Sequence, residues 1–277
     1  MPTTPDVFAS FRIPASDRSD RVARGKALRA DTPHSSLGEF RLADGRPDVV
    51  DLVRRTHQGR LEWLFGVRMA RMTASPFGFL RGSASLMGFD VANLPSTGML
   101  TTICGDAHIG NIGFYRSPEG TQVIDLNDFD EAHTGHWEWD LRRLTASIWV
   151  LGRDNGASED DCENAVQACV RSYRDEVSFL SKQPLMWRAF NQLDVDALEE
   201  SVTDPGLREE IRRQAIAARK RTDDRKLPKI SGGSTNAAHI VDAPPLITHT
   251  TDSEFEALAA GLDAYLPTLT PQWRRIV

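Results

Sequence analysis

The sequence has little cysteine, no long apolar run and no excess of positive charge. Its three cysteines, Cys104, Cys162 and Cys169, form no Cys-x-x-Cys pair, which argues against a disulfide scaffold and a zinc ribbon. There is no apolar stretch of about 18 residues and no basic-then-apolar N-terminus, so we expect a cytoplasmic protein without membrane association. The net charge of −6 does not favour nucleic-acid binding through a basic face.

What is present is an ordinary globular composition. The 277 residues are 40% hydrophobic and 26% charged, enough for one large or two small domains with a core. Residues 1–45 are polar and predict a solvated or loosely docked N-terminal arm, although their basic side chains leave a phosphate or substrate contact open. We therefore divide the chain into this arm and a domain over residues 46–277, with a helical extension over about 158–277.

Hydrophobic periodicity predicts a predominantly helical α+β fold. A helix over residues 47–72 ends before Ser75-Pro76, and another covers residues 84–91. Short strands are expected at 99–103, 112–115 and 121–126, the last two forming a small antiparallel hairpin sheet. Helices follow over residues 137–152, 158–182, 184–200 and 205–222, and from 253 onwards. The basic residues between 208 and 226 alternate with acids, which favours a solvated helix face over a phosphate patch.

The most informative segment combines residues 104–111 with residues 123–130. Asp106 lies five residues before Asn111, and Asp125 follows 14 residues after Asn111, at the end of an apolar run. Phosphoryl-transfer enzymes of the protein-kinase type use this order of an Asp that orients the attacking hydroxyl and an Asn and an Asp that hold metal. Asp106 is the candidate proton acceptor, while Asn111 and Asp125 offer the oxygen ligands that Mg²⁺ takes.

Other residues of the segment admit two interpretations. His108 is either a catalytic or ligand histidine or one that packs the loop. Asp128 and Asp130 are either metal ligands or turn residues. Gly105 and Gly110 would let the backbone turn tightly around these side chains. The plainest alternative is a hairpin with polar turns, which explains the Gly and Asn but not the Asp-to-Asn and Asn-to-Asp spacings.

Two resemblances accompany these motifs. The pattern Gly105-Asp106-x-His108-x-Gly110-Asn111, followed by Ile124-Asp125, resembles the aminoglycoside phosphotransferase and choline kinase branch of the kinase-like fold, with Cys104 in place of the usual His. The resemblance implies a catalytic (C-lobe) half whose small sheet carries the site, with Mg²⁺ and ATP as cofactors and a small molecule or protein hydroxyl as acceptor.

The chain is also similar to a bacterial family known as domain of unknown function 2252. The shared motifs are Arg24 to Arg29 with Ser35-Ser36, Ser75 to Gly82, Gly105 to Asn111, Asp125 to Glu131, Trp137 to Leu144, and Ile240 to Ile247. By the kinase-like resemblance, Asp140 is the helix aspartate that holds the catalytic-loop backbone as structural support. Arg81 is either a phosphate or carboxylate clamp or part of a structural ion pair.

The family comparison also implies a missing part. Its members look permuted, with a Gly-rich nucleotide-covering segment and a strand Lys after the catalytic loop. The glycine pair Gly232-Gly233 is followed by no such Lys strand. We therefore expect a chain truncated at its C-terminus, without the nucleotide-covering lobe; the alternative is a protein without an ordinary nucleotide site.

We expect Mg-nucleotide-dependent phosphoryl transfer to a hydroxyl if the protein is complete, and weak or no activity as it stands. The alternatives are a non-catalytic binding or regulatory protein, such as a degenerate pseudokinase, and a metal-dependent hydrolase. The hydrolase would use Asp106, His108, Asp125 and Asp128.

Overall fold

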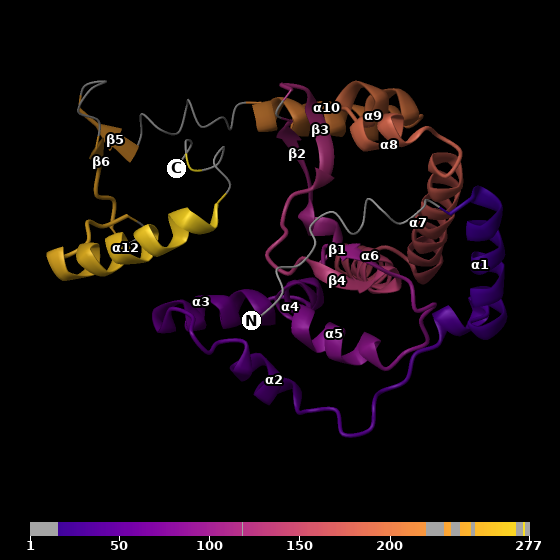
Figure 1. Cartoon of the computed structure of the whole chain (residues 1–277), viewed down its shortest axis with the longest axis horizontal. Coiled ribbons are helices and arrows are strands. Elements are labelled where there is room, and N and C mark those ends of the chain that lie inside the picture. The colour runs from indigo at the N-terminus through magenta and orange to yellow at the C-terminus, as the bar shows by residue number, and fades with distance from the viewer. Residues whose placement is uncertain are drawn as a thin grey trace, which may run out of the picture. The chain divides into compact units, whose positions relative to one another are not determined.

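The structure is a computed structural model that describes residues 16–117, 119–219, 230–233, 239–244, 247–269 and 274. The chain forms two compact units, Met1–Thr203 and Asp204–Val277. The described residues form an α+β fold that is predominantly helical (Figure 1), as predicted. None of their helices is long and apolar enough to cross a membrane.

The first unit begins with α1 (Arg18–Asp31), none of whose residues is buried. Residues 1–15 of the proposed arm lie outside the described residues. After the 3₁₀ helix η2 (His34–Gly38), the guanidinium of Arg46 donates two hydrogen bonds to Asp90, at 2.6 and 2.9 Å. Because this bidentate pair is partly buried, it attaches the end of the segment to α5 (Ala84–Ala92).

The helix predicted over residues 47–72 is interrupted. It consists of α2 (Val49–Arg55), the 3₁₀ helix η3 (Glu62–Leu64) and α3 (Phe65–Thr73). The break contains Gly59, whose φ of +78° is left-handed and cannot continue a right-handed helix. After α3, Ser75 caps the unpredicted α4 (Pro76–Gly82), with Pro76 in the first turn. The predicted helix over residues 84–91 is confirmed as α5.

The described strands pair two by two. The predicted hairpin is confirmed: β2 (Ile112–Arg116) pairs antiparallel with β3 (Gln122–Leu126). The first predicted strand, β1 (Leu100–Ile103), pairs instead with β4 (His133–His136). We did not predict β4, because its His-Thr-Gly-His sequence has no apolar alternation.

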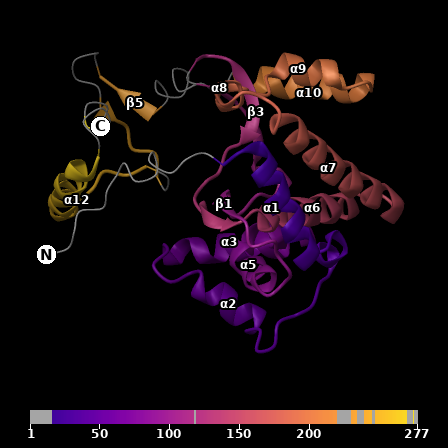
Figure 2. The same cartoon turned by 45° about the vertical axis from the view of Figure 1, so that its right-hand side comes forward.

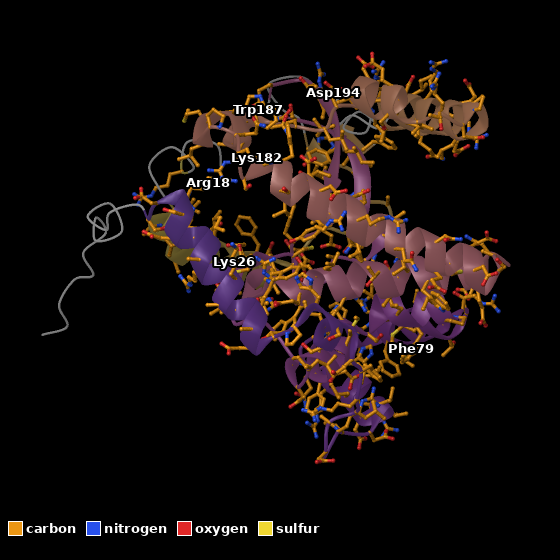
Figure 3. The ribbon with its side chains drawn as sticks, turned by 90° about the vertical axis from the view of Figure 1, so that its right-hand side faces the viewer. Arg18, Lys26, Phe79, Lys182, Trp187 and Asp194 are labelled. Atoms are coloured by element: carbon orange, nitrogen blue, oxygen red, sulfur yellow. The ribbon has the colours of Figure 1, made fainter. Side chains whose placement is uncertain are left out.

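Long helices follow the strands. The predicted helix from Trp137 is confirmed as α6 (Trp137–Asp154), which packs against α7 (Glu159–Leu180). Ser158 caps α7 in a capping box with Asp161, as predicted. The helix predicted over residues 184–200 is two helices, α8 (Leu185–Phe190) and α9 (Val195–Ser201). Asp194 caps α9 and bridges to β3 (Figure 3), where the backbone N–H of Ile124 donates to Leu193 at 3.0 Å.

The core of the first unit lies where α2 to α5 meet α6 and β1, and Figures 1 and 2 show these elements together. Close packing of α4 against α3 requires Gly82, since a Cβ there would lie 2.4 Å from Met72 Cγ. The buried apolar residues of this unit are Val53, Met72, Leu86, Val91, Leu94, Ile103, Cys104, Ala107, Val123, Cys162 and Val195.

The second unit contains α10 (Pro205–Arg219), the strand pair β5 (Ser231–Gly232) and β6 (His239–Ile240), α12 (Asp252–Tyr265) and the 3₁₀ helix η5 (Leu266–Thr268). The last predicted helix is confirmed, and Thr251 caps it in a capping box. Of the predicted helix over residues 205–222 and the basic segment up to 226, residues 220–226 lie outside the described residues.

Candidate functional site

The loop between β1 and β2 is held by α6. The carboxylate of Asp140 accepts two backbone N–H bonds, from Cys104 at 2.7 Å and from Gly105 at 2.9 Å. Two turns further along α6, the hydroxyl of Ser147 accepts from the N–H of Ile109 at 2.9 Å. Each of these loop donors is therefore satisfied by a helix side chain, which gives the loop one defined path past α6.

Asp106 projects from this loop onto a third side chain of α6. Its Oδ1 accepts from Arg143, whose Nε lies at 2.7 Å and whose Nη2 lies at 2.5 Å. Nη2 also donates to the carbonyl of Leu80 at 2.7 Å, and Arg143 is only 2% exposed. The pair thus fixes one carboxylate oxygen of Asp106.

The second oxygen of Asp106 lies near His108. Oδ2 is 3.8 Å from His108 Nε2, beyond hydrogen-bond distance. Burial lowers the pKa of His108, and the charges of Arg143 and Arg81 lower it further, against the opposing effect of Asp106. His108 is therefore a neutral, buried ring that packs edge-on against Phe77. Its Nδ1 is buried without a hydrogen-bond partner in the described part of the chain.

Asn111 closes the loop. Its Nδ2 donates to the backbone carbonyl of Asp106 at 2.9 Å, and the backbone carbonyl of Asn111 accepts from the N–H of Asn127 at 3.0 Å. The two glycines act differently. Gly105 has a φ of +80°, and a Cβ there would lie 2.3 Å from the carbonyl oxygen of Glu131. Gly110 has no positive φ, but a Cβ there would lie 3.2 Å from the His108 ring.

A cavity of about 230 Å³ opens beside Asp106. It brings together four of the predicted site residues, Arg81, Asp106, Asp128 and Asp130. Its walls carry both signs of charge, because arginines from the segment before α5 meet acids from the loops around β1 and β3. The full lining is Thr56, Arg60, Arg68, Arg81, Gly82, Ala84, Ser85, Asp106, Asp128, Asp130 and Glu131.

Asp125 is not among the residues that line this cavity. It lies within β3 opposite Gly113, is exposed, and its Oδ1 accepts from the neighbouring N–H of Leu126 at 2.8 Å. Asp128 lies two residues beyond the end of β3 and does line the cavity. Asp125 and Asp128 are both metal-ligand candidates in the sequence, but in the structure only Asp128 lines the cavity.

The acids near Asp106 are not gathered into a ready-made metal site. Across the described ranges, no three His, Cys, Asp or Glu side chains are gathered closely enough to hold a metal ion. The four residues of the hydrolase alternative are thus not assembled into one site. An amide and carboxylates do fit Mg²⁺, which usually takes one or two protein carboxylates and completes its shell with water and substrate phosphates.

Sequence reasoning missed Arg143, Arg60 and Arg68. A signal for Arg143 was available, because it follows Asp140 by three residues on one helix and therefore lies on the same face. Arg60 and Arg68 carry no comparable signal, since nothing in their surroundings along the chain indicates that they approach residues 106–131.

The comparison with family models identifies the family. The model described as "Uncharacterized protein conserved in bacteria (DUF2252)" matches residues 60–277, so the chain belongs to this family. The match confirms the resemblance that we based on the motifs, all but the first of which lie in the matched range. The comparisons with curated proteins and with solved structures gave no match.

Proposed function

We propose that the protein is the catalytic half of a kinase-like phosphotransferase, which moves a phosphoryl group from a Mg-nucleotide to a hydroxyl. The observation that supports this most is the asymmetric environment of Asp106. Arg143 holds one of its oxygens, and the residue lines a charged cavity. A carboxylate fixed in this way can orient an acceptor hydroxyl, which is the main protein contribution to phosphoryl transfer.

In the proposed step, the acceptor oxygen attacks the terminal phosphorus as the bond from phosphorus to the bridging oxygen breaks. The nucleoside diphosphate leaves, and the hydroxyl proton passes to Oδ2 of Asp106. Asp140 and Ser147 keep the loop, and with it Asp106, in place. His108 is neutral and buried and serves as a packing residue beside the carboxylate.

Asn111 and Asp128 are the proposed ligands of Mg²⁺, in place of the pair Asn111 and Asp125. Asp128 lines the cavity, whereas Asp125 and Asn111 do not. Asn111 is retained because its side chain contacts the backbone of Asp106. The side chain of Asn111 donates through Nδ2, and no described group donates to its Oδ1, which is therefore available as a ligand. When bound, Mg²⁺ would neutralise charge on the phosphate oxygens. Asp130 is a further oxygen ligand within the same cavity.

The test is Mg-dependent release of ADP from ATP by the purified protein, with a panel of hydroxyl compounds as acceptors. We expect Asp106→Asn to lower the turnover by about 10²- to 10⁴-fold, the range for loss of a general base. Asn retains an oxygen for Arg143 but removes the charge that pairs with the buried guanidinium, so we expect a lower thermal unfolding midpoint, and turnover is measured well below it. Turnover that survives in Asp106→Asn would refute the proposal.

The matched pair Asp128→Asn and Asp125→Asn tests the metal ligands. Both variants remove one carboxylate charge from the same stretch of chain, but only Asp128 lines the cavity. We expect Asp128→Asn to raise the Mg²⁺ concentration needed for half-maximal turnover at least tenfold, and Asp125→Asn to leave it unchanged. The reverse order would assign the metal to Asp125.

A second candidate function is non-catalytic binding of a phosphate-bearing ligand. No lysine lines the described cavity, whereas kinases use a lysine on the nucleotide phosphates. Stoichiometric ATP binding without ADP release under any acceptor would favour this second function.

A further inference from the structure

Arginines from three places in the chain line one wall of the cavity beside Asp106. Arg60 precedes η3, Arg68 lies on α3 and Arg81 lies on α4. No described acid lies within 4 Å of any of these guanidinium groups. These three residues, the arginine wall, are therefore a group of like charges that makes no ion pair within 4 Å in the described parts of the chain.

Arg68 shows how the wall is held. Its Nη1 donates to the hydroxyl of Thr56 at 3.0 Å, and its Nη2 donates to the carbonyl of Gly82 at 2.9 Å. Nη1 also lies 3.4 Å from Nε2 of His57, and burial together with the charges of Arg68 and Arg60 lowers the pKa of His57. The acceptors around Arg68 are thus neutral, so they orient its guanidinium without cancelling its charge.

Burial and neighbouring charges of both signs act on Arg68. Burial lowers the pKa of Arg68, and the charge of Arg60 lowers it further, against the weaker opposing effect of Glu131. An arginine remains protonated through such a shift. The partly buried guanidinium of Arg68 thus keeps its charge without an ion pair within 4 Å in the described residues, which leaves it available to an anionic ligand.

Arg81 extends the wall towards the catalytic loop. Its Nε lies 3.6 Å from the position that a Cβ would occupy at Gly110, and its charge lowers the pKa of His108. The side chain of Arg81 forms no hydrogen bond within the described residues, so its donors are available. Of our two interpretations of Arg81, an anion clamp fits this geometry and a structural ion pair does not.

Acids also line this cavity. Asp106, Asp128, Asp130 and Glu131 contribute carboxylates, and only Asp106 has an arginine partner, Arg143. Carboxylates and guanidinium groups that share a cavity of about 230 Å³ without pairing within 4 Å leave room for a ligand of both charges. Phosphate groups carrying a divalent cation have this character, with the phosphate suited to arginine and the cation to carboxylates.

We propose that the arginine wall of Arg60, Arg68 and Arg81 binds the phosphate groups of the ligand, while one or two of the carboxylates that line the same cavity hold its divalent cation. Guanidinium groups suit this task because their planar donors match phosphate oxygens in bidentate geometry. The wall would thereby supply the positive charge that a strand lysine supplies in kinases. Phosphate binding stands on the cavity alone, and only the assignment of the phosphates to a nucleotide rests on the proposed function.

The test is calorimetric titration of the full chain with pyrophosphate in the presence of Mg²⁺. We expect Arg60→Gln and Arg81→Gln each to weaken binding by about tenfold or more, the loss typical of one charge-assisted hydrogen bond. Arg71→Gln is the matched control, because Arg71 is an exposed arginine of α3 that does not line the cavity. We expect its affinity to equal that of the unaltered protein.

The outcomes separate cleanly. Equal weakening in all three variants would show general attraction of an anion to the surface and would overturn the proposal, as would absence of pyrophosphate binding. Arg68→Gln removes hydrogen bonds to Thr56 and Gly82 and can impair folding, so it is interpreted only when its thermal unfolding midpoint is unchanged. Arg60 and Arg81 form no such side-chain bonds and keep the test decisive.

A second titration, with inorganic phosphate, distinguishes the source of the phosphate. If pyrophosphate binds more tightly than inorganic phosphate and ATP displaces it, the ligand is a nucleotide. If inorganic phosphate binds more tightly than pyrophosphate, the ligand is a phosphorylated acceptor. Either result supports phosphate binding by the arginine wall. Wall-dependent binding without ADP release from ATP would uphold this inference and count against the proposed function. ADP release that is unaffected by Arg60→Gln and Arg81→Gln would support the proposed function and overturn this inference.

Discussion

Asp106 has one carboxylate oxygen engaged by a buried arginine. Since Arg143 is 2% exposed and fastened to the carbonyl of Leu80 as well, the carboxylate has little freedom to rotate away from the cavity. Removing either member would leave a buried charge without its partner, which costs far more than the pair contributes as an isolated contact. Position and charge at the site are thus decided by a residue that does not line the arginine-walled cavity.

Gly105 is the residue whose backbone most constrains this loop. Ala at Gly105 and at Gly59 would both be forced into the left-handed region, at φ of +80° and +78°. Only at Gly105 would the new Cβ also meet a neighbour, the carbonyl oxygen of Glu131 at 2.3 Å, whereas Gly59 has nothing within 4 Å. We expect Gly105→Ala to lower the free energy of unfolding by about 1–3 kcal/mol more than Gly59→Ala, the range for overpacking.

Urea unfolding of the two variants measures this difference. Because the backbone strain is common to both, Gly59→Ala serves as the control for strain alone. Equal destabilisation would mean that residue 131 moves aside without cost and that Gly105 is needed for its φ only.

The α6 helix acts as the support of the whole loop. Asp140, Arg143 and Ser147 follow one another at three- and four-residue spacing, so they lie on one face. Each contacts a different part of the loop, namely the N–H groups of Cys104 and Gly105, the carboxylate of Asp106 and the N–H of Ile109. One helix thus fixes both the path of the loop and the orientation of the Asp106 carboxylate.

Ser147→Ala tests this support. Ser147 is fully buried, so the N–H of Ile109 would lose its acceptor without gaining water, at a cost of about 1–3 kcal/mol. We expect a matching drop in the free energy of unfolding and faster hydrogen exchange at the Ile109 amide.

Thr145→Ala is the control on the same helix. The hydroxyl of Thr145 donates only to the α6 carbonyls of Leu141 and Arg142, so its removal leaves no loop donor unpaired. Faster exchange at Ile109 in both variants would show that the effect comes from loosening of α6 in general.

For the whole molecule, the two units differ in what they contain. Among the residues that the structure describes, the candidate site and all buried apolar residues but Ala215 lie in Met1–Thr203. A unit with its own core can fold without the rest of the chain. The arginine wall and the acids that share its cavity also belong to this unit alone.

We therefore expect a shortened chain of residues 1–203 to unfold in one cooperative urea transition. It should also bind pyrophosphate with Mg²⁺ as the full chain does. Circular dichroism and calorimetry would measure the two properties, with Arg81→Gln in the shortened chain as the control for specific binding. A shortened chain without a cooperative transition would show that residues 204–277 are needed for the core.

Local patterns alone were sufficient for much of this fold. The hairpin, α5, α6, the capping box of α7 and the last helix were predicted, because each depends on contacts between residues a few positions apart. Errors came where a local break competed with periodicity, as at Gly59 and before Asp194. The pairing of β1 with β4 was missed because it joins segments about thirty residues apart through a strand without an apolar pattern.

The sequence by itself determined the family and the loop that carries Asp106, because contiguous motifs identify both. Only the tertiary structure decided that Arg143 pairs with Asp106, that Asp128 and not Asp125 lines the cavity, and that Arg60 and Arg68 share this cavity with the acids. The physical reason is the range of the interactions. A turn or a cap is settled between neighbours in the chain, whereas the partner of a charge is known only once packing has brought distant segments together.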